Sequence, residues 1–241
     1  MSRLRRAAKL LDNMLAEEEV GRRAAPSLPP PPASLPPVEN SRLTQVATTG
    51  GTYEKARDVL RERGVEGPVI DYGAGRGHGA RALGGDSFEP YPGPGFQPTY
   101  SDPSSIPSDA YAGLVNLNVL NVLPPEVRDE AVRNMGRVLR PQGTAVITTR
   151  GRDVMAARGA PGPEPMSLII GEGDTARYQK GFTQTELREY LARVLGERFA
   201  VESMPLGPAG AVVRRLYGAG GVAVPIGASG LLAEPPEEPV R

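Results

Sequence analysis

Residues 69–79 read Val69-Ile70-Asp71-Tyr72-Gly73-Ala74-Gly75-Arg76-Gly77-His78-Gly79, and this stretch decides the fold of the chain. Its first two residues are apolar and β-branched, as an interior strand of a parallel sheet requires. The glycines that follow permit positive φ angles and let a ligand approach the backbone. A helix that begins after them offers free N–H groups to an anionic or polar ligand. The stretch therefore predicts a strand, a ligand-binding turn and a helix, with Asp71 at the carboxyl end of the strand, where open α/β sheets bind ligands.

The composition limits the classes of protein to consider. The chain has 241 residues, 39% of them hydrophobic, which allows one sizeable domain with extensions. It has no cysteine, which excludes disulfides, cysteine metal sites and a cysteine nucleophile. Lys+Arg 28 balance Asp+Glu 28, so the overall charge gives no argument for nucleic acid or membrane binding. Without an apolar run of membrane-spanning length or a signal-peptide core, we expect a cytoplasmic protein that does not associate with membranes.

Both ends of the chain differ in composition from its middle. Residues 1–24 predict an N-terminal amphipathic helix, since apolar residues recur at helical spacing over 3–20. The charges of this helix change from basic to acidic along its length, which suggests self-association or docking to a partner through residues 3–20, although a frayed helix is an equal alternative. Residues 25–47 are expected to form a proline-rich linker, and residues 218–241 a flexible tail. The folded domain is then predicted over 48–217.

Helical and strand signals alternate through this domain. The expected elements are, in order, a helix over 53–63, strands over 68–71, 87–89, 98–100 and 113–118, a helix from 124, a strand over 144–149, a long loop over 151–176, a helix over 183–195, and strands over 199–204 and 211–216. This order predicts an α/β fold with a mainly parallel sheet and helices on both faces. The last two strands must pair antiparallel, because only a short turn joins them.

Glu89 follows Asp71 at the end of the second predicted strand. An acidic residue about 20 positions beyond a glycine turn is where a ribose diol is bound, so the spacing indicates a nucleoside-containing ligand. A dinucleotide fingerprint would need a third glycine where this chain has His78, which disfavours a nicotinamide cofactor.

The stretch from Asp71 to Gly77 resembles motif I of class I S-adenosylmethionine-dependent methyltransferases. The order of elements over about residues 52–216 is similar to theirs, which implies a Rossmann-like, seven-stranded, mainly parallel sheet with one antiparallel strand and three α/β/α layers. The resemblance implies S-adenosyl-L-methionine as cofactor, with Glu89 on the ribose and Asp102 on the adenine amino group. The cofactor-binding residues that it implies are Asp71, Gly73, Gly75, Gly77, Glu89, Asp102, Asn118 and Val119.

A narrower resemblance involves Glu89-Pro90-Tyr91 and the run 115–123. Both are similar to segments of a group of methyltransferases associated with DNA phosphorothioation and phage genomes. That similarity implies a nucleic-acid or DNA-modification setting. However, the lack of cysteine excludes the covalent route to 5-methylcytosine. Pro124-Pro125 also lacks the flanking residues found in amino-methylating DNA enzymes.

Several residues have two readings. Asn116 and Asn118 share one face of a predicted strand and favour a functional role, whereas Asp102 could equally cap a turn. Asn121, Tyr178 and Lys180 are expected to contact the methyl acceptor. The run 178–182, which contains the last two, could be a substrate lid or equally an ordinary approach to the next helix. No general base and no metal site are indicated. The sequence thus predicts a methyltransferase with an unidentified acceptor; the alternative is a non-catalytic cofactor-binding module that acts through its N-terminal helix.

Overall fold

The computed structural model describes residues 34–45 and 51–217, and the structural statements below concern these residues. The helix predicted over 3–20, residues 25–33 and 46–47 of the predicted linker, and the whole predicted tail over 218–241 lie outside them. None of the helices in the described ranges is both long and apolar enough to cross a membrane.

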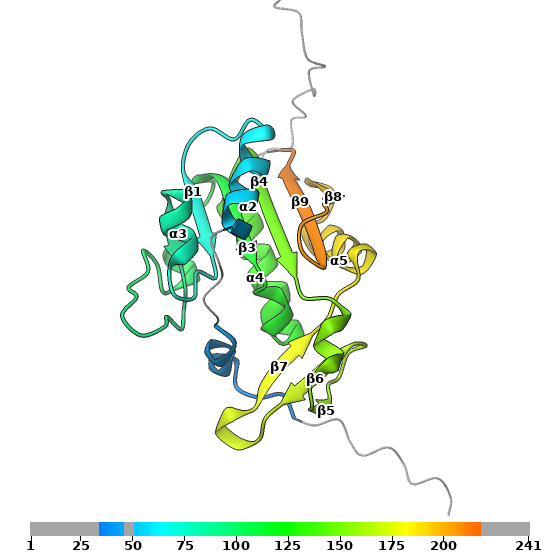
Figure 1. Cartoon of the computed structure of the whole chain (residues 1–241). Helices are drawn as coiled ribbons and strands as arrows, with labels where there is room; N and C mark the ends of the chain where they lie inside the picture. The colour runs from blue at the N-terminus through cyan, green and yellow to red at the C-terminus, as the bar shows by residue number, and fades with distance from the viewer. Residues whose placement is uncertain (1–33, 46–50, 218–241) are drawn as a thin grey trace, which may run out of the picture. The chain divides into compact units, whose positions relative to one another are not determined.

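Six strands form the main sheet, in the order β2-β1-β3-β4-β9-β8 (Figure 1). Their bounds are Val69–Tyr72 for β1, Asp86–Phe88 for β2, Tyr111–Leu117 for β3, Leu139–Thr149 for β4, Phe199–Ser203 for β8 and Ala209–Arg215 for β9. Strands β1 to β4 run parallel, and β9 is antiparallel to both β4 and β8. The predicted mainly parallel sheet with one antiparallel strand is confirmed.

Four α-helices cover the two faces of this sheet. They are α2 (Gly51–Glu62), α3 (His78–Leu83), α4 (Pro125–Val138) and α5 (Gln184–Leu195). The apolar side of α2 packs with Val115 and Val146, whereas α4 and α5 pack with Ile70 and Leu114 on the opposite face. Successive residues of a strand point to opposite faces. Hence Asp71 faces α2, and its neighbour Tyr72 faces α4.

The predicted seventh strand at Pro98–Tyr100 is reduced to a single bridge. Tyr100 pairs in parallel with Phe88, and its N–H donates to the Ser87 carbonyl at 2.9 Å. Pro98 has no N–H to continue the ladder, and a second proline, Pro103, follows closely. The prediction of seven strands is therefore wrong: the sheet has six.

The crossover from β2 to β3 lacks an α-helix. Between Phe88 and Tyr111 it contains only one turn of 3₁₀ helix, η2 (Pro103–Ser105). Arg137 of α4 holds this segment, because its guanidinium donates to the Ile106 carbonyl at 2.8 Å and the Pro103 carbonyl at 2.9 Å. This segment, with Ile106 buried in the core, takes the place of a crossover helix beside β2.

The region predicted as a loop, residues 151–176, forms a second small sheet together with the residues that follow it. Its antiparallel strands are β5 (Ala160–Pro161), β6 (Ser167–Ile170) and β7 (Arg177–Lys180), flanked by the 3₁₀ turns η4 (Arg152–Ala156) and η5 (Gly173–Thr175). Leu168 and Ile169 are buried, so this short apolar run is the signal for a strand that the prediction missed.

Residues 34–45, which the sequence assigned to the linker, pack on the fold. They contain the 3₁₀ helix η1 (Val38–Thr44), which contacts β7. The side-chain amide of Asn40 is buried and donates to the Ala176 carbonyl at 2.8 Å. In Figure 1, η1 and the small sheet both lie beyond the carboxyl ends of β3 and β4. Together they form a layer across the edge of the main sheet where ligands bind.

Candidate functional site

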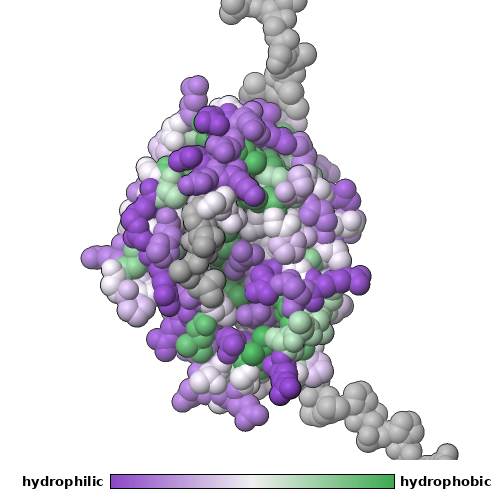
Figure 2. Space-filling model, viewed as in Figure 1, coloured by the Kyte–Doolittle hydropathy of each residue, from purple (hydrophilic) through white to green (hydrophobic). Residues whose placement is uncertain are grey.

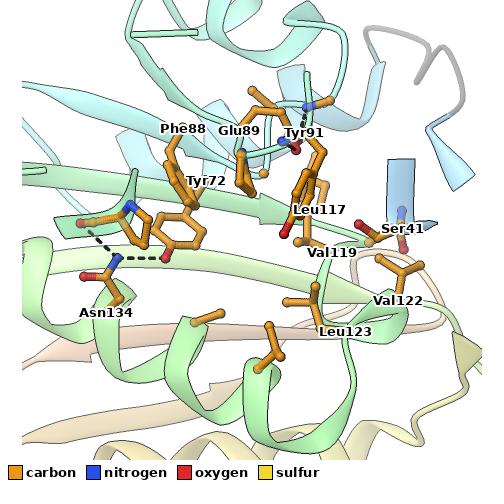
Figure 3. Close-up of a pocket in the computed structure, with 18 of the residues that line it drawn as sticks. Ser41, Tyr72, Phe88, Glu89, Tyr91, Leu117, Val119, Val122, Leu123 and Asn134 are labelled. Atoms are coloured by element: carbon orange, nitrogen blue, oxygen red, sulfur yellow. Dashed lines mark hydrogen bonds between the residues drawn. The ribbon is translucent and has the colours of Figure 1, made fainter. Parts of the chain in front are cut away.

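A cavity of about 640 Å³ opens at the carboxyl ends of β1, β2 and β3. The chain leaves β1 toward β2 on one side and returns to β3 on the other, so this is the switch point of the sheet. Its volume lies within the range of pockets that enclose small ligands. In Figure 3, Tyr72, Phe88 and Asn134 lie at one end of the cavity, and Ser41, Val122 and Leu123 lie at the other.

Glu89 is the best-defined polar group of the cavity. It follows β2 directly, and its side chain is 7% exposed. One carboxylate oxygen accepts from the Gly75 N–H at 2.7 Å, and the other accepts from the Tyr91 N–H at 3.0 Å. Burial raises the pKa of Glu89, and these two hydrogen bonds oppose the shift. The carboxylate is therefore fixed between two loops and keeps lone pairs for a ligand hydroxyl.

Gly73 of the turn is required by close approach, and Gly75 is favoured by its positive φ. A Cβ on Gly73, whose φ is +93°, would lie 2.4 Å from Val119 Cγ2. Gly75 has a φ of +56°, and the Gln45 side chain lies 3.5 Å from where its Cβ would be. Gln45 in turn donates to the Tyr91 carbonyl at 2.8 Å. The glycine turn thus forms a bare backbone floor between Val119 and the segment that carries η1.

Asp71 does not line the cavity. It is 0% exposed, and no described residue provides a hydrogen-bond partner for either carboxylate oxygen. A Cβ on Gly79 would lie 2.1 Å from both Asp71 Oδ2 and Tyr53 Cε1, so the carboxylate sits behind the turn, against α2 and α3. Burial, and secondarily the Glu89 carboxylate, raises the pKa of Asp71 to about 7. Direct contact between Asp71 and a ligand, as the sequence predicted, does not fit this position.

The two asparagines of β3 have different positions. Asn116 is fully buried, and its amide donates to the Tyr72 carbonyl at 2.7 Å, so it ties β3 to β1 away from the cavity. Asn118 lies just beyond the strand at a φ of +57° and lines the cavity. Asparagine tolerates this left-handed conformation better than most residues do.

Two further predicted cofactor residues have structural roles. Asp102 is exposed and accepts from the N–H and the hydroxyl of Ser104, both at 2.8 Å, so it caps η2. These bonds hold the pKa of Asp102 below its usual range. Gly77 begins α3 at a φ of +75°, and a Cβ there would lie 2.2 Å from Phe96. Neither residue lines the cavity, although Ser104 does.

The three predicted acceptor contacts also lie outside the cavity lining. Tyr178 donates to Glu164, and Lys180 forms an ion pair with Glu186 at 2.7 Å, so both side chains hold the small sheet in place. Asn121 is 2% exposed within the 3₁₀ turn η3 (Leu120–Val122). Burial removes these three from the acceptor surface, and Tyr178 and Lys180 also have partners inside the fold.

Other residues reach the cavity that the sequence did not single out. Beside Gln45, they include Tyr53 from α2 and Asn134 from α4, whose amide donates to the Tyr72 hydroxyl at 2.9 Å. In the sequence, these polar residues cannot be told apart from ordinary solvent-facing residues. Only the packing of the fold identifies them as lining the cavity. Within residues 34–45 and 51–217, no three acidic or histidine side chains are grouped as a metal site needs.

No model of a protein family matches the sequence, and no curated protein matches it. Solved structures do match its fold. The sugar N-methyltransferase KedS8 from Streptoalloteichus sp. has a TM-score of 0.53 at 15% identity, over 80% of this chain and 99% of that one. The PH0226 protein from Pyrococcus horikoshii has a TM-score of 0.51 at 14% identity, over 70% and 92%.

A third match is the 1,6-didemethyltoxoflavin-N1-methyltransferase of Burkholderia thailandensis, whose structure contains 1,6-didemethyltoxoflavin and S-adenosylhomocysteine. Its TM-score is 0.50 at 18% identity, over 76% of this chain and 92% of that one. At these identities the similarity concerns the fold. The chain has the Rossmann-like α/β fold of S-adenosylmethionine-dependent methyltransferases.

Proposed function

We propose that this protein is a methyltransferase that uses S-adenosyl-L-methionine. The observation that carries the proposal is Glu89, a buried carboxylate at the end of β2, held by the Gly75 N–H at 2.7 Å and facing the cavity at the switch point of the sheet. A carboxylate in this position suits the two hydroxyls of a ribose. The fold similarity to methyltransferases supports the same conclusion.

Further features of the cavity support the proposed cofactor. The floor at Gly73 and Gly75 has no side chains, and a Cβ on Gly73 would collide with Val119. Glu89 would hold the ribose, and Asn118 and Val119 would border the cofactor at the end of β3. These residues are the ones we assign to the cofactor from the predicted set.

The chemistry needs little from the protein beyond positioning. When bound, the cofactor supplies a methyl group on a positively charged sulfur, which makes that carbon strongly electrophilic. The glycine turn and Glu89 would fix the donor, while η1 and the residues after β3 would hold the acceptor in line with it. Correct orientation of two reactants can by itself remove several kcal/mol from a barrier.

Calorimetric titration with S-adenosylmethionine and S-adenosylhomocysteine tests the proposal. We expect binding of both ligands, and turnover when a suitable acceptor is present. Absence of binding at millimolar ligand would exclude the proposed function. Binding of both ligands without turnover on small-molecule, protein or nucleic-acid acceptors would instead favour the non-catalytic module.

A further inference from the structure

One end of the cavity has an uncharged lining. We call it the η1 end and define it by seven residues: Val38, Ser41, Thr44, Leu117, Asn118, Val122 and Leu123. They come from η1, from the end of β3 and from the turn that precedes α4. In Figure 3, Ser41, Val122 and Leu123 lie together, on the opposite side from Asn134. The hydroxyls and one amide provide hydrogen bonds without charge.

The charged side chains of the cavity are not among these seven residues; one of them, Arg76, lies on the glycine turn. Glu130, Arg133 and Arg137 belong to the part of α4 that surrounds Asn134, at the far end of the cavity. Glu89 is engaged by two backbone N–H groups between the ends. His78 is exposed at the start of α3, where its Nδ1 lies 3.2 Å from an Arg81 nitrogen. None of these groups belongs to the η1 end.

The phenols of the cavity are also unsuited to remove a proton. Burial, and secondarily Asp71, raises the pKa of Tyr53. Burial raises the pKa of Tyr72 to about 12, and it raises that of Tyr91 as well. All three side chains therefore stay protonated near neutral pH. Among the described residues, the η1 end has no side chain able to act as a general base.

The η1 segment makes this end a walled pocket. The Asn40 amide fastens the segment to the Ala176 carbonyl at 2.8 Å, and Gln45 fastens it to the Tyr91 carbonyl at 2.8 Å. Both arginines and glutamates line the cavity. Single-stranded nucleic acids instead require a continuous, positively charged groove. Hydrophilic residues dominate the face shown in Figure 2, with hydrophobic residues in small groups. The walled pocket and the mixed charges of the cavity favour a small acceptor over a polymer.

We propose that the η1 end binds a small, uncharged acceptor whose attacking atom is already unprotonated, such as a ring nitrogen of a heteroaromatic compound. This inference rests on the proposed function. The lone pair of the nitrogen forms the bond to the methyl carbon, the carbon–sulfur bond breaks, and its electron pair stays on the sulfur. The positive charge passes from sulfur to the acceptor, and the protein takes up no proton.

Binding of chosen probes to the full chain tests the inference without turnover. Quinoline and benzimidazole are titrated into protein saturated with S-adenosylhomocysteine, in parallel with quinoline-4-carboxylate, benzimidazole-5-carboxylate and a duplex DNA oligonucleotide. We expect the neutral heterocycles to bind at least tenfold more tightly than their carboxylated counterparts. With S-adenosylmethionine, the pH dependence of the N-methylation rate should follow the pKa of each probe. It should not reflect the titration of any group of the protein.

A pair of arginine variants in η1 tests the location. Ser41 lines the cavity, whereas Leu43 is 47% exposed and does not. Ser41→Arg should weaken binding of the neutral probes at least tenfold and change the affinity for S-adenosylhomocysteine less than twofold. Leu43→Arg, which adds the same side chain to the same short helix, should change neither.

The outcomes separate this inference from the proposed function. Failure to bind S-adenosylhomocysteine and S-adenosylmethionine would remove the proposed function itself. If the protein binds the cofactor but none of the neutral probes, the inference is overturned and the proposed function stands. The same holds if the protein prefers the carboxylated probes or DNA. Unchanged probe affinity in Ser41→Arg would also overturn it.

Discussion

Replacing Glu89 by glutamine perturbs the central contact of the site while it keeps the size of the side chain. The two carboxylate oxygens accept from different backbone donors, Gly75 at 2.7 Å and Tyr91 at 3.0 Å. Glutamine has one acceptor oxygen, so its NH₂ group must face one of these donors. A hydrogen bond to a charged group contributes about 1.5–3 kcal/mol, and we expect a loss of this size in ligand binding. The dissociation constant of S-adenosylhomocysteine should then rise roughly 10- to 150-fold.

Calorimetric titration at neutral pH measures this change, and circular dichroism checks that the variant is folded. Glu130→Gln is the matched control, because Glu130 also lines the cavity but is an exposed residue of α4. We expect its effect to be less than about twofold, as for a solvent-screened charge. An unchanged affinity in Glu89→Gln, or an equal loss in the control, would refute the assignment of the ribose site.

Three further variants test the geometry around the cavity. Gly73→Ala puts a Cβ 2.4 Å from Val119 Cγ2 at a φ of +93°, so urea unfolding should show a loss of about 2–4 kcal/mol. Val119→Ala should recover part of this loss, and full stability of Gly73→Ala alone would contradict the close approach. Asp71, with its pKa raised from 3.8 to about 7, binds a proton in the folded state over a pH range where the unfolded state does not. The free energy of unfolding of the wild type should therefore fall as pH rises from about 4 to about 7. Asp71→Asn should lack this slope and be about 1–4 kcal/mol more stable than the wild type at pH 8. Parallel pH curves for the two proteins would contradict the raised pKa of Asp71. Glu164→Ala leaves the buried Arg128 guanidinium without its 2.6 Å partner, so the free energy of unfolding should fall by about 3 kcal/mol. Adding Arg128→Met should restore most of this loss. A double variant as unstable as Glu164→Ala would contradict this account.

The main sheet could be predicted because its signals are local. Val69 and Ile70 lie just before the glycine turn, and Thr183 with Glu186 forms a capping box at the start of the helix predicted over 183–195. The antiparallel pairing of β8 and β9 followed from the short turn between them. Each of these features depends on a few neighbouring residues, which a sequence displays directly.

The rest of the site depends on contacts between distant residues. Tyr178 pairs with Glu164, and the Asn40 amide reaches the Ala176 carbonyl across 136 positions, so neither partner could be read from spacing. Asp71 was assigned to the ligand because it ends a strand, but β-strand alternation directs it toward α2 instead. Proline at position 98 was an available signal against the seventh strand.

The wall formed by η1 has a consequence for the rate of turnover. Gln45 lies beside the glycine turn and donates to the Tyr91 carbonyl, and we expect this contact to hinder the release of a bound nucleoside. Opening of a surface segment is slowed by solvent viscosity, whereas a chemical step is not, and such openings limit many enzymes. We expect kcat to fall as viscosity rises and to increase in Gln45→Ala; a kcat independent of viscosity would contradict this. The speed of the enzyme would then be set by residues that touch neither reacting atom.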